Sequence, residues 1–254
     1  MQSTHVLITG GASGIGLATA QRFREDNFKV TLVDVVECNR QAEEIGAHSV
    51  ALDVRDERAI ENLATQLDEQ NDLVNILVTC ACSLQRPLSP GALSWQVWAL
   101  IQRVPLRGSY ACCRSFGERM VRSRNGGAIV LVSSISGLRS SPLHSYGPAK
   151  AAIIQLTRTL AAQWGLQGVR VNCVAPGFTA TPALHRGFET GTLQQDTLES
   201  QSALGRLVAP GEVADAIAFL ASPAASGITG TTLPVDAGHL VASDWDVYGG
   251  LGHR

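Results

Sequence analysis

The sequence predicts an α/β fold: a single, doubly wound domain with a parallel seven-stranded sheet and helices on both faces. Seven short runs rich in β-branched residues recur along the chain, and segments with helical spacing separate most of them. Apolar strands that alternate with helices are typical of a parallel sheet covered on both faces. The 254 residues, of which 45% are hydrophobic and 17% charged, suffice for one large domain with a substantial core.

The predicted strands follow one another at regular intervals, at residues 5–10, 29–34, 49–54, 75–80, 128–134, 169–176 and 231–238. Helical spacing is clearest in residues 18–25 and 58–69, where apolar side chains recur every three or four positions. No composition shift or internal repeat divides the chain, so we treat residues 1–254 as one domain. Residues 178–207 are polar and irregular in pattern, and we interpret them as a substrate-binding lid.

Composition narrows the classes of partner and the compartment. A formal net charge of -2 gives no reason to expect nucleic acid or an anionic membrane surface as a partner. No apolar run has the length of a membrane span, and the first residues lead directly into a strand rather than a signal peptide. The cysteines lack CxxC spacing, which favours reduced, mostly buried thiols in a cytoplasmic protein over disulfides or a metal site. They are Cys38, Cys80, Cys82, Cys112, Cys113 and Cys173.

The first predicted strand leads into a glycine-rich turn, "TGGASGIG", with Gly10, Gly14 and Gly16 at the start of a helix. Glycine lets the backbone approach a pyrophosphate, whose charge is then met by amide groups and the positive end of the helix. The strand–turn–helix context favours a dinucleotide site. The alternative interpretation is a tight turn without a ligand.

The second predicted strand ends at Asp34. A carboxylate at this place accepts hydrogen bonds from both ribose hydroxyls of an adenosine and repels a phosphate on that ribose. No arginine or lysine follows it closely, so the sequence favours NAD over NADP, and it argues against an NADPH-dependent biosynthetic reductase. The alternative is that Asp34 serves only as a turn residue at the strand end.

Ordered motifs along nearly the whole chain resemble those of the short-chain dehydrogenase/reductase family. They are "TGGASGIG", the "DV" of Asp53 and Val54, "SSISG", the YxxxK pair of Tyr146 and Lys150, "NCVAPGFTAT" and "GTTLPVDAG". The resemblance implies a Rossmann-like domain that transfers a hydride between NAD and a secondary alcohol or ketone. The chain uses only two lysines, and one of them, Lys150, follows the tyrosine by four positions.

In the family this tyrosine exchanges the proton of the substrate oxygen, so its phenolate must be stabilised. Residues four apart share one helical face, so Lys150 can lie beside Tyr146 and lower its pKa. Pro148 fits the first helical turn, where its missing amide proton costs nothing. The family's serine matches Ser134 by its S-x-x-G motif, whereas the usual spacing to the tyrosine points to Ser133. We favour Ser134 as the third catalytic residue, and only one of the two is expected to face the site.

The resemblance also implies a set of cofactor-binding residues. They comprise Gly10, Ser13, Gly14, Ile15, Gly16, Asp34, Asp53, Val54, Cys80, Ala81, Cys82, Tyr146, Lys150, Pro176, Gly177, Thr179 and Thr181, and no metal ligand is expected.

Two departures from the family pattern qualify the implied activity. The family's "NNAG" is here "TCAC", at residues 79–82, and the helical asparagine of its proton relay is replaced by Pro105. We expect a local disturbance of the helix at Pro105, because proline removes a backbone hydrogen bond and clashes with the carbonyl of Ile101. These departures keep open a second interpretation, a family member that binds NAD without turnover and has a sensing or structural role.

The resemblance further implies a homotetramer, assembled partly through the helices that contain Trp98 and Lys150, and a small-molecule alcohol or ketone as the substrate. Residues 239–254 form a C-terminal tail that extends beyond the family's usual end.

Overall fold

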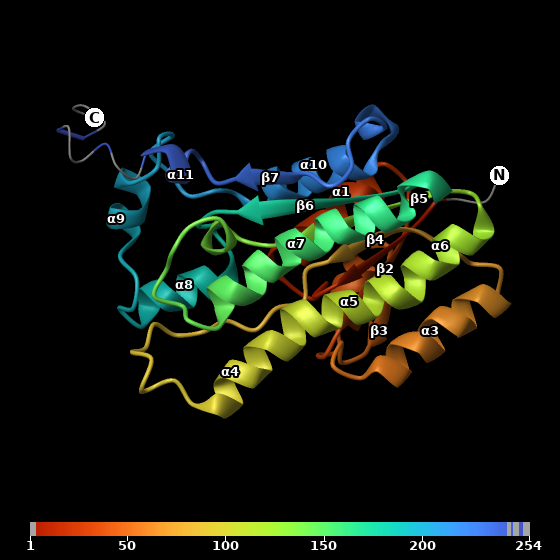
Figure 1. Cartoon of the computed structure of the whole chain (residues 1–254), viewed down its shortest axis with the longest axis horizontal. Helices are drawn as coiled ribbons and strands as arrows, with labels where there is room; N and C mark the ends of the chain where they lie inside the picture. The colour runs from red at the N-terminus through yellow and green to blue at the C-terminus, as the bar shows by residue number, and fades with distance from the viewer. Residues whose placement is uncertain (1–3, 243–244, 246–248, 251–254) are drawn as a thin grey trace.

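A computed structural model describes residues 4–242, 245 and 249–250 of the chain, and in it seven parallel strands form one sheet in the order β3-β2-β1-β4-β5-β6-β7. The predicted fold class is therefore confirmed. Figure 1 shows the strands between two layers of helices. The strands are β1 (His5–Thr9), β2 (Lys29–Asp34), β3 (His48–Ala51), β4 (Val74–Thr79), β5 (Gly127–Val132), β6 (Val169–Pro176) and β7 (Thr232–Val235).

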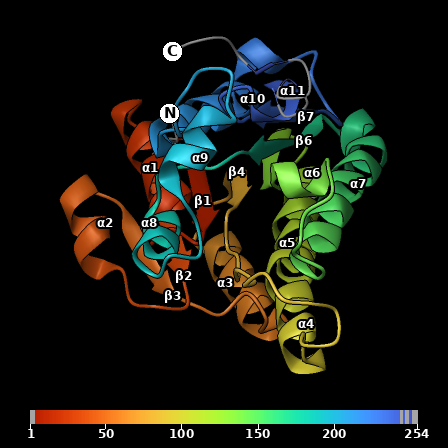
Figure 2. The same ribbon diagram turned by 90° about the vertical axis from the view of Figure 1, so that its left-hand side faces the viewer.

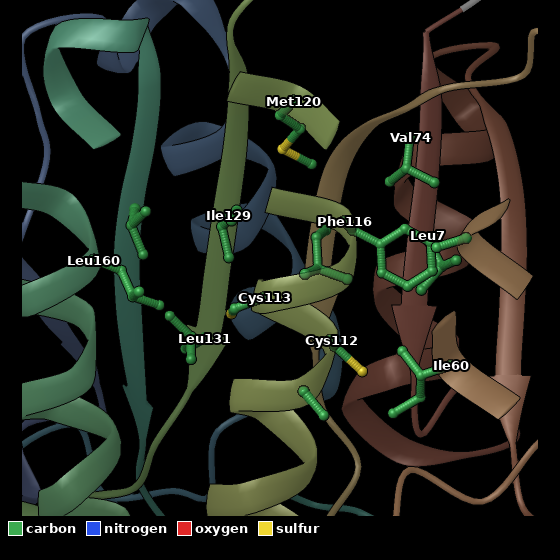
Figure 3. Packing of buried hydrophobic residues seen from close by; sticks show 14 of the residues in the cluster. Leu7, Ile60, Val74, Cys112, Cys113, Phe116, Met120, Ile129, Leu131 and Leu160 are labelled. Atoms are coloured by element: carbon green, nitrogen blue, oxygen red, sulfur yellow. The ribbon is translucent and has the colours of Figure 1, made fainter. Parts of the chain in front are cut away.

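Alternation along each strand divides the core into two clusters, one on each face of the sheet. In β1, Leu7 belongs to one cluster, whereas its neighbours Val6 and Ile8 belong to the other. The first cluster packs against α3 (Glu57–Glu69) and α7 (Tyr146–Trp164), and Figure 3 shows part of it. The second packs against α1 (Gly14–Glu25), α2 (Asn39–Ile45) and α10 (Pro210–Ala221). Because both faces are covered, a central strand such as β5 (GAIVLV) is apolar at nearly every position rather than alternating with polar residues.

A long helical run on the first face contains the disturbance expected at Pro105. It comprises α4 (Trp95–Gln102), a π-helical segment Arg103–Gly108, α5 (Ser109–Cys112), a second π-helical segment Cys113–Gly117 and α6 (Glu118–Ser123). Pro105 is buried within the first π-helical segment. A wider turn accommodates the missing backbone hydrogen bond of proline, so the expectation of a locally disturbed helix is confirmed.

The segment 178–207, which we interpreted as a substrate-binding lid, contains two helices that its irregular sequence pattern did not indicate. They are α8 (Pro182–Glu189) and α9 (Gln195–Ser200). Thr181 accepts a hydrogen bond from the amide of Leu184 at 3.3 Å, and Pro182 occupies the first helical turn. This pair is an ordinary helix start signal. In Figures 1 and 2, α8 and α9 lie at the end of the molecule toward which β6 and β7 point.

The C-terminal tail predicted at residues 239–254 begins with the short helix α11 (His239–Ala242), and most of its remainder lies outside the described residues. Within the described part of the chain, no helix combines the length and the apolar character needed to cross a membrane.

Candidate functional site

The residues predicted to bind a cofactor follow the C-terminal ends of the strands, around the point where the strand order reverses. The chain crosses back there from β3 to β4, which lies beside β1, and such a switch point is where open α/β sheets bind ligands. The turns after the two strands touch each other. A Cβ on Gly10 would lie only 2.7 Å from the amide nitrogen of Ala81, and Gly10 has a φ of 70°. Only glycine fits this position.

The N-terminus of α1 is suited to bind an anion. The helix begins at Gly14 after Ser13, whose side chain makes no capping hydrogen bond, and its first turn contains no acidic residue. A Cβ on Gly16 would overlap the carbonyl oxygen of Gly10, so the turn and the helix approach each other as closely as backbones can. Unsatisfied amides and the helix dipole stabilise a phosphate at such a place. These residues therefore fit the pyrophosphate of a dinucleotide.

Asp34 ends β2 beside this turn. Its Oδ2 accepts a hydrogen bond from the amide of Ala12 at 3.0 Å, and its Oδ1 accepts one from the amide of Val36 at 3.3 Å. The carboxylate thus braces the glycine-rich turn. It is placed where the adenosine ribose of a dinucleotide lies in such folds.

Ser134, Tyr146 and Lys150 come together from β5 and α7. Tyr146 is the first residue of α7, so Lys150 lies one turn further along, and its Nζ is 5.5 Å from the centre of the tyrosine ring. Pro148 lies in this first turn, as predicted. Ser134 follows β5, and its hydroxyl lies near enough to Tyr146 to lower the pKa of the phenol. Ser134 and Tyr146 are both partly exposed, so a small molecule can reach their hydroxyl groups.

Lys150, in contrast, is buried, with 3% of its surface exposed. Its Nζ donates a hydrogen bond to the carbonyl oxygen of Val132 at 2.8 Å. Ser133 points away from Tyr146, because its hydroxyl donates to the backbone carbonyl of Lys150 at 2.7 Å. The structure therefore gives the two serines different positions: Ser133 joins β5 to α7, and Ser134 faces the tyrosine.

Burial and neighbouring charges shift the pKa values of Tyr146 and Lys150 in opposite directions. Desolvation raises the pKa of Tyr146 to about 12, whereas the Lys150 ammonium and the nearby hydroxyl of Ser134 act to lower it. Burial alone would lower the pKa of Lys150, but the anionic forms of Cys82, Tyr146 and Cys173 outweigh it and raise the pKa. Lys150 thus stays charged, and its charge stabilises the phenolate.

The turn after β4 places the thiol of Cys82, which was expected among the cofactor-binding residues, close to Tyr146. Cys82 is exposed, and its proximity raises the pKa of Tyr146. Burial raises the pKa of the Cys80 thiol to about 12. All six cysteines are free, and four of them are buried. In "TCAC" the backbone is held to β1, because the amide of Cys80 donates to the carbonyl of Thr9 at 3.0 Å.

Comparison with known proteins decides the family. The sequence pattern of a family described as enoyl-(acyl carrier protein) reductase matches residues 10–239. The chain is 37% identical to galactitol 2-dehydrogenase (L-tagatose-forming) of Cereibacter sphaeroides, over 92% of this chain and 94% of that protein. The chain belongs to the short-chain dehydrogenase/reductase family. It is therefore an oxidoreductase by family, and members of known structure hold nicotinamide cofactors.

Solved structures of similar proteins agree on the fold and differ in the cofactor. A Brucella melitensis 16M protein named ribose-5-phosphate isomerase is 45% identical with a TM-score of 0.96, over 100% of this chain and 98% of that one. A 3-oxoacyl-[acyl-carrier protein] reductase of Brucella melitensis with bound NAD is 32% identical, with a TM-score of 0.82 and coverage of 92% and 90%. ElxO with bound NADP is 28% identical, with a TM-score of 0.87 and coverage of 94% and 99%.

The remaining residues that the dehydrogenase/reductase motifs suggested lie at the same edge of the sheet. Asp53 and Val54 follow β3, and hydrogen bonds from Arg55 lower the pKa of the Asp53 carboxyl. Pro176 ends β6 and is followed by Gly177, where a Cβ would lie 2.7 Å from Asp236. Thr179 is buried, and Thr181 caps α8.

Sequence reasoning missed one polar residue in the loop after β4. Gln85 is buried, and its side chain bonds to the backbone at the start of α7. No motif marks it, and only the three-dimensional structure brings it to Tyr146.

Proposed function

We propose that the protein is an NAD-dependent dehydrogenase that interconverts a secondary alcohol and a ketone, with a polyol as the substrate class. The observation that carries the proposal is the grouping of Ser134, Tyr146 and Lys150 at the edge of the sheet that also carries the glycine-rich turn. The polyol class is suggested by similarity to galactitol 2-dehydrogenase.

In the proposed reaction, the hydroxyl of Ser134 donates a hydrogen bond to the substrate oxygen and orients it. The phenolate of Tyr146 accepts the hydroxyl proton of the alcohol, and in the reverse direction the phenol returns it. Lys150 holds its positive charge beside the ring and stabilises the phenolate. When bound, NAD accepts the hydride that leaves the carbon of the alcohol.

Support for NAD over NADP comes from Asp34. Its carboxylate accepts hydrogen bonds on both oxygens from neighbouring amides and is therefore fixed in place. A phosphate on the adenosine ribose would meet this fixed negative charge. The other cofactor residues proposed from the motifs, from Gly10 to Thr181, serve the same dinucleotide.

The test combines the purified protein with NAD or NADP and a panel of polyols and simple secondary alcohols, and follows the absorbance of the reduced nicotinamide. We expect turnover with NAD. In Tyr146→Phe the turnover rate should fall at least about a hundredfold, because general acid–base catalysis contributes that much or more. The affinity for NAD should stay within a few-fold, since the ring remains. Turnover in Tyr146→Phe at a tenth or more of wild type would remove Tyr146 from the mechanism.

Two other functions make different predictions in the same experiment. The substitutions "TCAC" and Pro105 favour a member that binds NAD without turnover, which would show saturable NAD binding and no reduction with any alcohol. The similarity to the Brucella protein named ribose-5-phosphate isomerase favours aldose–ketose isomerisation. That activity would convert ribose 5-phosphate into the ketose with no net reduction of NAD.

We also propose a homotetramer formed partly through α4. This helix exposes apolar side chains, with Trp95 81% exposed and Trp98 37% exposed. A single chain leaves them in water, whereas an interface between subunits would cover them. Light scattering after size exclusion measures the state, and a monomer at micromolar concentration would contradict the proposal.

A further inference from the structure

The residue before the proposed catalytic tyrosine is the centre of a buried polar cluster. Ser145 is fully buried, and it stands at the position where a serine usually caps a helix. Its side chain makes no capping bond, because the hydroxyl instead donates to the carbonyl of Trp98 at 2.9 Å. Gln102 donates from Nε2 to the carbonyl of Ser145 at 2.8 Å and to its hydroxyl at 3.1 Å. Ser145 thus joins α7 to α4 and leaves the helix without a local cap.

Gln85 supplies the cap from a distant part of the chain. Its Oε1 accepts hydrogen bonds from the amide of Ser145 at 2.8 Å and from the amide of Tyr146 at 3.1 Å. The first amides of a helix have no partner within the helix, so these two bonds satisfy donors that would otherwise be buried without one. One of the two donors belongs to the proposed catalytic residue itself.

The orientation of this carboxamide follows from its partners. Both groups that face Oε1 are donors, so the oxygen must point toward them. The Nε2 of Gln85 is then buried without a hydrogen-bond partner, and only 7% of the residue is exposed. An unsatisfied buried donor is unfavourable. The two hydrogen bonds to Oε1 therefore hold the side chain in place, and Nε2 forms no hydrogen bond.

We propose that Gln85 is a positioning residue for the reaction: its oxygen fixes the first backbone amides of α7 and thereby the place of the Tyr146 phenol relative to Lys150. This inference rests on the proposed function of Tyr146. Tyr146 lies at the very end of the helix, where fraying is greatest, whereas Lys150 lies one turn inside and is anchored to Val132. Only the tyrosine depends on the cap to keep its distance from the lysine.

The test compares Gln85→Met, which keeps the length and loses the acceptor, with Gln85→Glu, which keeps one acceptor oxygen and replaces the unsatisfied NH2 group with a second oxygen. For Gln85→Met we expect kcat to fall about tenfold to a hundredfold with KM changed little, because small misplacements of a reacting group are costly. The limb of the pH profile that reports Tyr146 should move to higher pH, since the phenol lies farther from the ammonium. In Gln85→Glu the added charge also moves this limb upward, but the maximal rate at high pH should return to that of wild type.

A readout without turnover makes the test independent of the substrate. Hydrogen exchange at the amides of Ser145 and Tyr146 should be at least about tenfold faster in Gln85→Met than in wild type or Gln85→Glu, because the hydrogen bonds to residue 85 protect these amides from exchange. Asp56→Ala is the matched control, since the Asp56 carboxylate caps α3 by accepting from the amides of Arg58 and Ala59, each at 3.0 Å. It should lower the melting temperature but leave kcat and the exchange at residues 145 and 146 unchanged.

Wild-type kcat and unchanged exchange in Gln85→Met would overturn the proposal, and so would fast exchange at these amides in Gln85→Glu. If Gln85→Met does not fold, the exchange and the high-pH rate of Gln85→Glu decide the matter. A Tyr146→Phe protein that keeps its turnover would instead refute the proposed function, whatever the exchange at the cap shows.

Discussion

Replacing Lys150 with methionine removes the positive charge beside Tyr146 while keeping an unbranched side chain of similar length. The ammonium lies 5.5 Å from the centre of the tyrosine ring, and Lys150 is buried whereas Tyr146 is partly exposed. At an effective dielectric constant of about 20, a charge at that distance contributes about 3 kcal/mol, so its loss should raise the pKa of Tyr146 by about 2. Alcohol oxidation requires the phenolate, so turnover near neutral pH should fall about a hundredfold, since each pH unit below the pKa costs tenfold.

The assay is kcat/KM for alcohol oxidation against pH. The limb that reports Tyr146 should move upward by about two pH units in Lys150→Met, and activity should partly return at the highest pH. Lys150→Arg is the matched variant, because it keeps the charge but not the compact ammonium that bonds to Val132. It should lose rate with a smaller displacement of the limb. A limb in Lys150→Met within half a pH unit of wild type would refute the electrostatic role.

Three further perturbations test other parts of the structure. Cys82→Ala removes a group that raises the pKa of Tyr146, so the same limb should move to lower pH, and an unmoved limb would contradict that contact. Asp34→Ala should narrow the preference for NAD over NADP mainly by weakening NAD, as titrated binding constants will show, and equal wild-type constants would contradict the NAD assignment. His5 is buried and desolvation lowers its pKa, so the unfolded chain takes up its proton first and stability falls as pH drops below about 6.5. When the pH is lowered from 7.5 to 5.5, the melting temperature of His5→Gln should fall less than that of wild type. An equal fall would show that His5 does not set the pH dependence of stability.

The sequence predicted the strands well because each is a short apolar run with helical segments between. The predicted ends of the strands were less accurate. The third strand was expected to reach Val54 but ends at Ala51, because the paired strand β2 ends opposite it at Asp34. Beyond that point Asp53 turns back to accept the amide of Arg55 at 2.9 Å. A strand ends where its partner ends, and a single sequence does not show the partner.

Some residues of the candidate site could likewise be predicted from the sequence, and others could not. Tyr146 and Lys150 were predictable, since helical spacing alone places residues four apart on one face. Ser134 was favoured over Ser133 on its S-x-x-G motif alone, because the sequence does not show which hydroxyl meets the backbone carbonyl of Lys150. Gln85 lies 60 residues before Ser145 in a loop without periodicity, so no local pattern could indicate the cap it provides.

The two π-helical segments also affect how this protein can change in length. Each π-helical turn holds about one residue more than an α-helical turn, so it stores a single-residue insertion without rotating the rest of the helix. Deleting one residue from Arg103–Gly108 can be absorbed by a return to α-helical geometry, and the faces of α5 and α6 would stay in phase with the sheet. The same deletion within α6 would rotate the later residues of that helix by about 100°. The chain therefore tolerates loss of a residue beside Pro105 better than loss of one a few turns later.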